Sequence, residues 1–187
     1  MMLRLFDFVL AVVGLLLAGP LMAMLYLIGL WDTGAPLFKQ VRVGQYMRPF
    51  ALYKFRTMRP DTASLGTHLV DATSVTPLGL FLRRTKLDEL PQLWNVVKGE
   101  MSIVGPRPCL FNQQELINER NKYGVFDARP GITGLAQVRG IDMSTPRLLA
   151  EIDKQMVESL NSKSYIYLIF ATLAGAGQGD RTKGTPK

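Results

Sequence analysis

The hydrophobic pattern divides the chain into an apolar N-terminal stretch and a longer part in which apolar and polar residues are mixed. Residues 8–30 carry no charge and are mostly Leu, Val, Ala, Met and Ile, which is long enough to cross a bilayer core as a helix. Gly19 and Pro20 lie near the middle, where a proline removes a backbone hydrogen bond and favours a kink. The pattern predicts either a kinked membrane span or a re-entrant helix, broken at Gly19 and Pro20, that leaves by the face it entered.

The basic residues favour the re-entrant form. Arg4 precedes the apolar stretch and every other Lys and Arg follows it, so a re-entrant helix keeps all of them on the cytoplasmic side, whereas a span would export Arg4. We therefore expect residues 1–31 to form a re-entrant membrane helix. Residues 32–187 are expected to form a cytoplasmic domain that ends in a mobile basic tail.

Beyond residue 31 the pattern changes to short elements, which predicts an α+β domain that is mainly helical with a small β-hairpin. Residues 37–43 and 50–58 read as two strands around a loop that contains glycine and proline. Alternation along the second strand places Lys54 and Arg56 on one face, where they could meet a phosphate or solvent.

Helical periodicity is strongest after these strands. Residues 165–176 are apolar but too short for a membrane span, so they belong either to the core or to an amphipathic helix at the membrane interface. Residues 129–138 read as a turn and a short extended piece. Four further helices are expected. They start near Leu78, near Leu90, near Phe111 and at Pro146, which follows a threonine and suits the first helical position.

Two adjacent carboxylates, Asp88 and Glu89, precede one of these helices. The apolar residues that follow have helical spacing: Leu90, Leu93, Trp94 and Val97. Asp88 is therefore well placed to cap the helix. A carboxylate pair close to arginines also suits phosphoryl transfer, since one acid can act as nucleophile or metal ligand and the other as base. The residues alone leave both interpretations open.

The net charge narrows the expected partners. The chain carries a formal charge of +7 at pH 7, and the excess follows residue 31 because Arg4 and Asp7 cancel. This surplus suits phosphorylated substrates and anionic membrane lipids, at about 1 kcal/mol per basic residue near the surface. No nucleic-acid-binding motif accompanies the charge, so nucleic acid is not an expected partner. The sequence leaves a homodimer open.

The reactive side chains exclude some chemistry. Cys109 is the single cysteine, so an internal disulfide is excluded and a reducing compartment fits. We expect Cys109 to be a small buried residue. His68 is the single histidine and is expected at the surface, which excludes a histidine-based metal cluster or catalytic triad.

Five short motifs cover most of residues 37–138, and in sequence and order they resemble the bacterial sugar transferases, the monotopic phosphoglycosyl transferases. After Val138 that family usually continues with an Asn-Gly-Arg segment and a tryptophan, whereas here residues 139–146 differ. The motifs are Lys54–Met58, Leu87–Val96, Lys98–Ser102, Val104–Pro108 and Arg129–Val138.

The resemblance implies a fold, a location and a reaction. The family's proline-broken membrane helix would seat the domain on the cytoplasmic face of the bacterial inner membrane. The enzyme would move a sugar phosphate from a UDP-sugar to polyprenol (undecaprenyl) phosphate, giving polyprenyl diphosphate-sugar and UMP, the first membrane step of glycoconjugate assembly.

The same resemblance implies roles for individual residues. Asp88 would be the nucleophile that forms an aspartyl-phosphosugar intermediate, and it would hold Mg²⁺ together with the diphosphate. Glu89 would act as base for the acceptor phosphate. The residues expected to bind phosphate or nucleotide are Lys54, Arg56, Arg83, Arg107, Arg129 and Gln137.

Two other classes of function fit the composition. A membrane-anchored basic adaptor would bind anionic lipids or proteins without catalysis and would tolerate Asp88→Asn. A membrane phosphohydrolase with an aspartyl intermediate would transfer the phosphoryl group to water rather than to a lipid phosphate.

Overall fold

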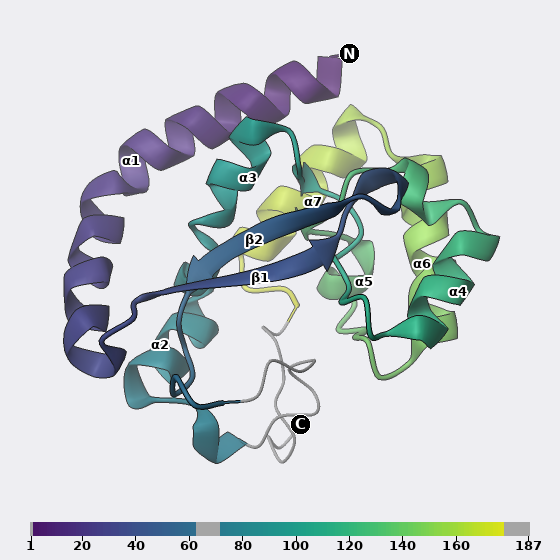
Figure 1. Ribbon diagram of the computed structural model, residues 1–187. Coiled ribbons are helices and arrows are strands. Elements are labelled where there is room, and N and C mark those ends of the chain that lie inside the picture. Colours follow the sequence, from purple (N-terminus) through teal and green to yellow (C-terminus); the bar gives the residue numbers. More distant parts are fainter. Residues whose placement is uncertain (1, 63–71, 178–187) are drawn as a thin grey trace.

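The structure is a computed structural model that describes residues 2–62 and 72–177, and it confirms an α+β fold. Helices surround a small antiparallel hairpin that runs diagonally across the molecule (Figure 1). His68 and the basic tail from residue 178 onwards, which the sequence predicted to be a surface residue and a mobile segment, lie outside the described residues.

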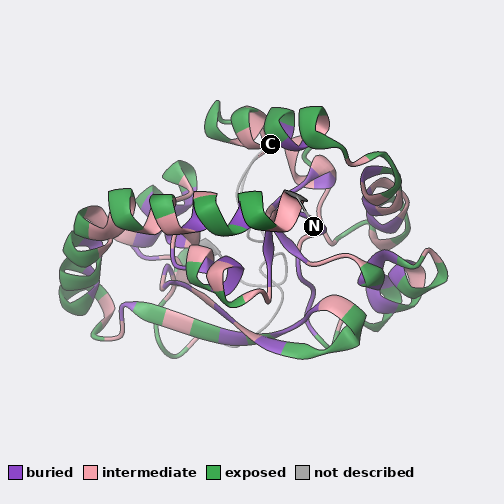
Figure 2. Ribbon diagram, turned by 90° about the horizontal axis from the view of Figure 1, so that it is seen from above, coloured by how far each residue is buried: buried purple, intermediate pink, exposed green. Residues whose placement is uncertain are grey.

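The N-terminal helix α1 (Met2–Thr33) continues through Pro20 and bends as it crosses the domain (Figure 1). The expected break at Gly19 and Pro20 is thus a bend within one helix, because a proline removes one hydrogen bond but need not unwind the turns around it. The helix is long and apolar enough to cross a membrane. Its outer face is largely exposed (Figure 2), and the side chains there include Leu5, Leu16, Leu17, Leu27 and Trp31.

Both ends of α1 are attached to the same domain. Near its start, the Arg4 guanidinium donates to the backbone carbonyls of Val97 and Met101, at 3.3 and 3.4 Å. At its far end, the Asp32 carboxylate accepts a hydrogen bond of 2.7 Å from the Thr76 hydroxyl. A re-entrant helix requires this arrangement, since its two ends must return to one side of the membrane. Re-entry itself stays a prediction.

The hairpin consists of β1 (Leu37–Val43) and β2 (Pro49–Phe55), paired antiparallel from Leu37 opposite Phe55 to Val43 opposite Pro49. The second strand ends before the predicted Met58, which instead forms an isolated bridge with Val75. Against the hairpin lies a core of buried residues from α1, from β2, from the helix of residues 92–98 and from the loop after that helix: Ala11, Phe50, Leu52, Val96 and Met101.

The predicted helices are present, with shifted starts. The helix expected near Leu90 begins two residues later, and a short helix lies within residues 129–138, where only a turn and an extended piece were expected. The helices after the hairpin are α2 (Pro77–Thr85), α3 (Gln92–Lys98), α4 (Gln114–Lys122), α5 (Leu135–Val138), α6 (Pro146–Ser159) and α7 (Ser162–Leu173).

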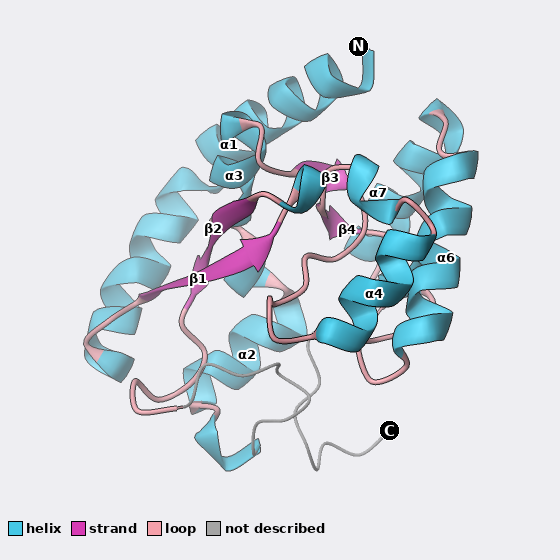
Figure 3. Ribbon diagram, turned by 45° about the vertical axis from the view of Figure 1, so that its right-hand side comes forward, coloured by secondary structure: helices cyan, strands magenta, loops and turns pink. Residues whose placement is uncertain are grey.

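Two strands of three residues each, β3 (Ser102–Val104) and β4 (Gly131–Thr133), form a parallel pair beside α7 (Figure 3). Their backbones come very close: a Cβ on Gly131 would lie 2.0 Å from the backbone nitrogen of Gly105. Only glycine permits this approach. The sequence did not predict this pair.

A buried ion pair joins α4 to α6. The Arg120 guanidinium donates to one carboxylate oxygen of Asp153 through Nε and Nη2, at 2.9 and 2.6 Å, and both side chains are only 2% exposed. Nη1 of Arg120 donates to the backbone carbonyl of Arg107 at 2.8 Å. The pair therefore also fixes the backbone of the Val104–Pro108 motif.

We predict that Asp153→Ala destabilises the protein strongly, because it leaves the Arg120 charge buried without its partner. Such a loss costs about 3–5 kcal/mol and lowers the melting temperature by roughly 10 °C in a domain of this size. Thermal unfolding of detergent-purified protein measures the shift. Glu158→Ala is the control, since Glu158 lies on the same helix in an exposed ion pair 3.7 Å long. Equal melting temperatures for the two variants would contradict the role assigned to this pair.

Candidate active site

The turn that carries Asp88 and Glu89 is shaped by the residues just before it. Thr76 caps α2 by accepting a hydrogen bond of 2.9 Å from the Gly79 amide. The helix ends at Lys86, which has a left-handed backbone with φ of 59°. A non-glycine residue in this region carries backbone strain of order 1–3 kcal/mol. The chain is thereby reversed into a 3₁₀ turn, η4 (Leu87–Glu89), that presents both carboxylates.

Asp88 does not cap the following helix, so the capping interpretation is wrong. The cap of α3 is Pro91, without a side-chain hydrogen bond, and Asp88 lies one turn earlier, only 6% exposed. The left-handed residue before it inserts a 3₁₀ turn where the apolar spacing had suggested that the α-helix begins. Asp88 is thus a buried carboxylate in a strained turn, as residues at functional sites often are.

The apolar stripe predicted for α3 is also partly wrong. Trp94 is 52% exposed, and the buried positions of the helix are Gln92, Asn95 and Val96. The Asn95 amide donates to the Ala51 carbonyl at 2.7 Å and its oxygen accepts from the Tyr53 amide at 3.2 Å. Because these two residues belong to β2, Asn95 fixes the helix after the carboxylate turn to the hairpin.

Glu89 faces Arg107. One carboxylate oxygen accepts a hydrogen bond of 2.7 Å from Nη2 of Arg107, and both side chains are partly exposed. The pair joins the Leu87–Val96 motif to the Val104–Pro108 motif. The sequence predicted a carboxylate pair close to arginines but did not predict this particular ion pair. A planar guanidinium fork can bind a phosphate through two hydrogen bonds, and phosphate contact by Arg107 stays a prediction.

Lys86 connects the turn to the end of α7. Its ammonium donates to the carbonyls of Thr172 and Ala176, at 3.2 and 2.7 Å, where a cation is favoured by the helix dipole. Burial lowers the pKa of this ammonium; Glu89 opposes the shift and Arg107 reinforces it. Sequence reasoning missed Lys86, because its partners lie more than eighty residues further along the chain.

Arg83 lies on α2 and contacts the segment that follows β2. Its guanidinium is buried and donates from Nε to the Thr57 hydroxyl at 2.9 Å. The helix can approach this strand end because Gly79 has no side chain; a Cβ there would lie 2.0 Å from the Thr57 carbonyl oxygen. Arg83 therefore joins the Lys54–Met58 motif to the helix that leads into the carboxylate turn.

Lys54 lies on β2, whereas Arg56 follows the last residue of that strand, which is shorter than predicted. Both cations lie over the Phe38 ring, at 5.7 and 5.3 Å from its centre. Arg56 also donates from Nε to the Ala35 carbonyl at 2.8 Å, so it stabilises the connection between α1 and β1. Lys54 is buried. Phosphate contact by either residue stays a prediction.

Arg129 and Gln137 contact the backbone. Arg129 donates from Nε to the Gly99 carbonyl at 3.1 Å, and the Gln137 amide nitrogen donates to the Ile132 carbonyl at 2.8 Å. The amide oxygen of Gln137 is buried and accepts no hydrogen bond from the residues that the structure describes. A role for either side chain in nucleotide binding stays a prediction.

The carboxylate turn fits a metal ion that needs few protein ligands. Within residues 2–62 and 72–177 there is no group of three or more His, Cys, Asp and Glu side chains suited to holding an ion. Mg²⁺ commonly binds one or two carboxylates and substrate phosphates and keeps several waters. Asp88 is the residue that would hold Mg²⁺, and binding of the ion there stays a prediction.

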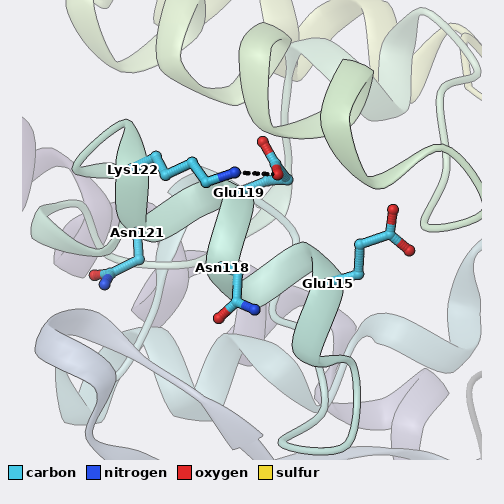
Figure 4. A pocket seen from close by; sticks show the side chains of 5 residues that line it. All are labelled: Glu115, Asn118, Glu119, Asn121 and Lys122. Carbon is cyan, nitrogen blue, oxygen red and sulfur yellow. Dashed lines mark hydrogen bonds and ion pairs between the residues drawn. The ribbon is translucent and has the colours of Figure 1, made fainter.

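Three further features lie apart from this turn. Cys109 is buried, as predicted, and burial raises the pKa of its thiol against the opposing effect of Arg120. The divergent residues 139–146 form a partly exposed turn that leads from α5 into α6. A shallow hollow on α4 contains none of the predicted site residues; it is lined by Glu115, Asn118, Glu119, Asn121 and Lys122 (Figure 4).

Comparisons with known proteins identify the family of this chain. The family model described as bacterial sugar transferase matches residues 1–178. The chain is 38% identical over 157 residues to "Uncharacterized sugar transferase EpsL" of Bacillus subtilis (strain 168), which covers 83% of this chain and 77% of the relative. It is 39% identical over 162 residues to the UDP-glucose:undecaprenyl-phosphate glucose-1-phosphate transferase of Caulobacter vibrioides, with 80% and 61% covered.

A third relative is the undecaprenyl-phosphate galactose phosphotransferase of Salmonella typhimurium, 36% identical over 154 residues, with 73% of this chain and 32% of the relative covered. The chain therefore spans about three quarters of the Bacillus relative but less than two thirds of the other two. Because the family model matches almost the whole chain, the conclusion is direct: this protein belongs to the bacterial sugar transferase family.

Proposed function

We propose that the protein transfers a sugar phosphate from a UDP-sugar to polyprenol phosphate, releasing UMP and forming polyprenyl diphosphate-sugar. The observation that carries the proposal is the buried Asp88 in a strained turn, next to a Glu89 that binds Arg107 at 2.7 Å. The Caulobacter relative is named for transfer of glucose 1-phosphate between UDP-glucose and undecaprenyl phosphate. The Salmonella relative is named an undecaprenyl-phosphate galactose phosphotransferase.

In the first half-reaction a carboxylate oxygen of Asp88 attacks the phosphorus that bears the sugar. A bond forms between that oxygen and phosphorus, and the bond from phosphorus to the bridging oxygen breaks, so UMP leaves with the bridging oxygen. Arg107 binds the phosphoryl oxygens and stabilises their charge. Mg²⁺, when bound at Asp88, supplies further neutralisation of the diphosphate.

In the second half-reaction an oxygen of the polyprenol phosphate attacks the same phosphorus. The bond to Asp88 breaks, its carboxylate is regenerated, and the new diphosphate carries the sugar. Glu89 accepts any proton that the acceptor phosphate carries. Its ion pair with Arg107 keeps both side chains beside the phosphorus atom at which the two half-reactions take place.

The exposed apolar face of α1 explains where the acceptor is met. A polyprenyl chain stays in lipid while its phosphate lies at the surface, so the site must lie close to the membrane. In this proposal α1 is re-entrant, which keeps the site at the membrane surface and exports no part of the chain; the attachment of both its ends to the domain supports this. The cytoplasmic face of the inner membrane is the location where a UDP-sugar and the lipid phosphate are both accessible.

We predict that Asp88→Asn lowers turnover by roughly a thousandfold or more, because the change removes a covalent route rather than one contact. The fold should be retained, since asparagine has nearly the same shape. Transfer of radiolabelled sugar phosphate to undecaprenyl phosphate measures the loss. Asp127→Asn, at an exposed position, is the control and should keep full activity. Activity of Asp88→Asn within tenfold of wild type would exclude Asp88 as the nucleophile, whereas absence of any transfer by the wild-type protein would favour the adaptor alternative.

A second prediction concerns the order of the two half-reactions. Enzyme mixed with UDP-sugar and magnesium, without acceptor, should release close to one UMP per enzyme and then stop, since ping-pong chemistry needs no lipid in its first step. Chelation of the metal should abolish the burst. Glu89→Gln should slow transfer to lipid more than it slows the burst. Continued UMP release without acceptor would support the phosphohydrolase, and no burst at saturating UDP-sugar would support direct attack by the lipid phosphate.

The third prediction concerns topology. In a background where the buried Cys109 is replaced by alanine, cysteines at Met2 and at the exposed Trp31 should both be protected from a membrane-impermeant thiol reagent in intact cells and labelled after lysis. Pro20→Leu restores a helical hydrogen bond and should increase labelling at Met2. Labelling at Met2 alone in the unaltered helix would establish a span.

A further inference from the structure

Asp7 is a buried carboxylate in an otherwise apolar stretch of α1, and the proposed chemistry gives it no role. It is 3% exposed. It accepts hydrogen bonds from the Ile103 amide at 2.8 Å, from the Ser102 hydroxyl at 2.9 and 3.0 Å, and from the Tyr165 hydroxyl. A buried charge costs several kcal/mol unless donors surround it. Here the donors come from β3 and α7, so three elements converge on one side chain.

The strand that binds Asp7 leads directly to Arg107. Two backbone hydrogen bonds hold this strand to the β4 segment. The Ser102 amide donates to the Pro130 carbonyl at 2.9 Å, and the Gly105 amide donates to the Thr133 carbonyl at 2.8 Å. A Cβ on Gly105 would lie 2.4 Å from the Arg129 carbonyl oxygen. The short segment from Ser102 to Arg107 therefore has little freedom to absorb a shift at its start.

The other donor links Asp7 to the site by a second route. Tyr165 lies on α7, the helix whose end binds the Lys86 ammonium through the Thr172 and Ala176 carbonyls. Burial and the contact with Asp7 raise the pKa of the Tyr165 phenol, so the phenol keeps its proton and donates. The strand β4 is also attached to α7, because the Thr133 and Thr172 hydroxyls are hydrogen-bonded to each other.

We propose that Asp7 is a positioning residue. Through its hydrogen bonds to β3 and α7, it couples the position of the N-terminal half of α1 to the position of Arg107 opposite Glu89. The membrane helix is then part of the machinery that assembles the site, and not only its anchor. The inference rests on the proposed function solely in treating Arg107 and Glu89 as groups that act on the substrate.

Two substitutions test the contacts with the least disturbance. Asp7→Asn removes the charge while keeping the shape, and Tyr165→Phe removes one hydroxyl while keeping Asp7. Each should lower kcat roughly ten- to hundredfold, since a misplacement of about 1 Å can cost that much. Tyr167→Phe is the matched control, because Tyr167 lies on the same helix and is 64% exposed; it should change kcat less than about twofold.

A double-mutant cycle separates positioning from general destabilisation. If Asp7 acts through Arg107, then Asp7→Asn should lower kcat in the wild-type background and cause little further loss in Arg107→Ala, because the side chain that it positions is already missing. Tyr165→Phe should behave in the same way. Equal factors in both backgrounds would show that Asp7 only supports the fold, and would overturn the proposal.

Amide hydrogen exchange provides a readout that does not depend on activity. Tyr165→Phe and Asp7→Asn should raise exchange in the peptide that spans residues 102–107, while exchange in the hairpin of residues 37–55 stays unchanged. If the wild-type protein transferred no sugar phosphate, the proposed function would fail, and the exchange result would still decide whether α1 is coupled to this segment. Unchanged exchange in both variants would overturn the proposal even in an active enzyme. If Asp7→Asn does not fold, Tyr165→Phe decides alone.

Discussion

The site depends on the contact between two backbones at Gly105 and Gly131, where the parallel strands β3 and β4 come together too closely for any side chain. This contact fixes the direction in which the chain leaves β3, and Arg107 follows two residues later. The Arg120 guanidinium then holds the Arg107 carbonyl from the other side, at 2.8 Å. The arginine is thus positioned from its backbone outward, which reduces the entropy lost when it binds a phosphate.

Around this contact the molecule combines two requirements that conflict. A domain that binds a charged nucleotide needs water on its surface, whereas the acceptor of the proposed reaction has its hydrocarbon chain in lipid. The bend of α1 (Figure 1) and its attachment at Arg4, Asp7 and Asp32 reconcile them. Much of the apolar surface of the helix is exposed, and its charged side chains Arg4, Asp7 and Asp32 are hydrogen-bonded to the domain.

Much of this fold follows from local patterns in the sequence. Alternation located the hairpin, and the Thr-Pro pair located the start of α6, because both signals act within a few residues. The motifs singled out Asp88, Glu89 and Arg107 from the sequence, and the structure places Glu89 against Arg107. The extended piece expected within residues 129–138 is β4, but β3 and its pairing with β4 were not predicted, because strands of three residues are too short for alternation to be recognised.

The other errors have the same physical origin. Asp88 seemed a good cap because the apolar spacing starts at Leu90, yet the left-handed backbone of Lys86 inserts a 3₁₀ turn first. The roles of Lys86 and Asp7 were not visible, because their partners are distant in the sequence. Lys86 contacts Ala176, 90 residues away, and Asp7 contacts Tyr165, 158 residues away. Long-range contacts decide these roles, and residue type alone does not.

The central claim is that the sugar phosphate passes through a covalent bond to Asp88. Its most direct test is peptide mass spectrometry of enzyme quenched after reaction with a UDP-sugar and magnesium in the absence of acceptor. The account predicts an added sugar phosphate on the peptide that contains Asp88, lost on addition of polyprenol phosphate with formation of the lipid-linked product. A fully active enzyme whose Asp88 peptide never carries this mass, under conditions in which acyl phosphates survive, would contradict it.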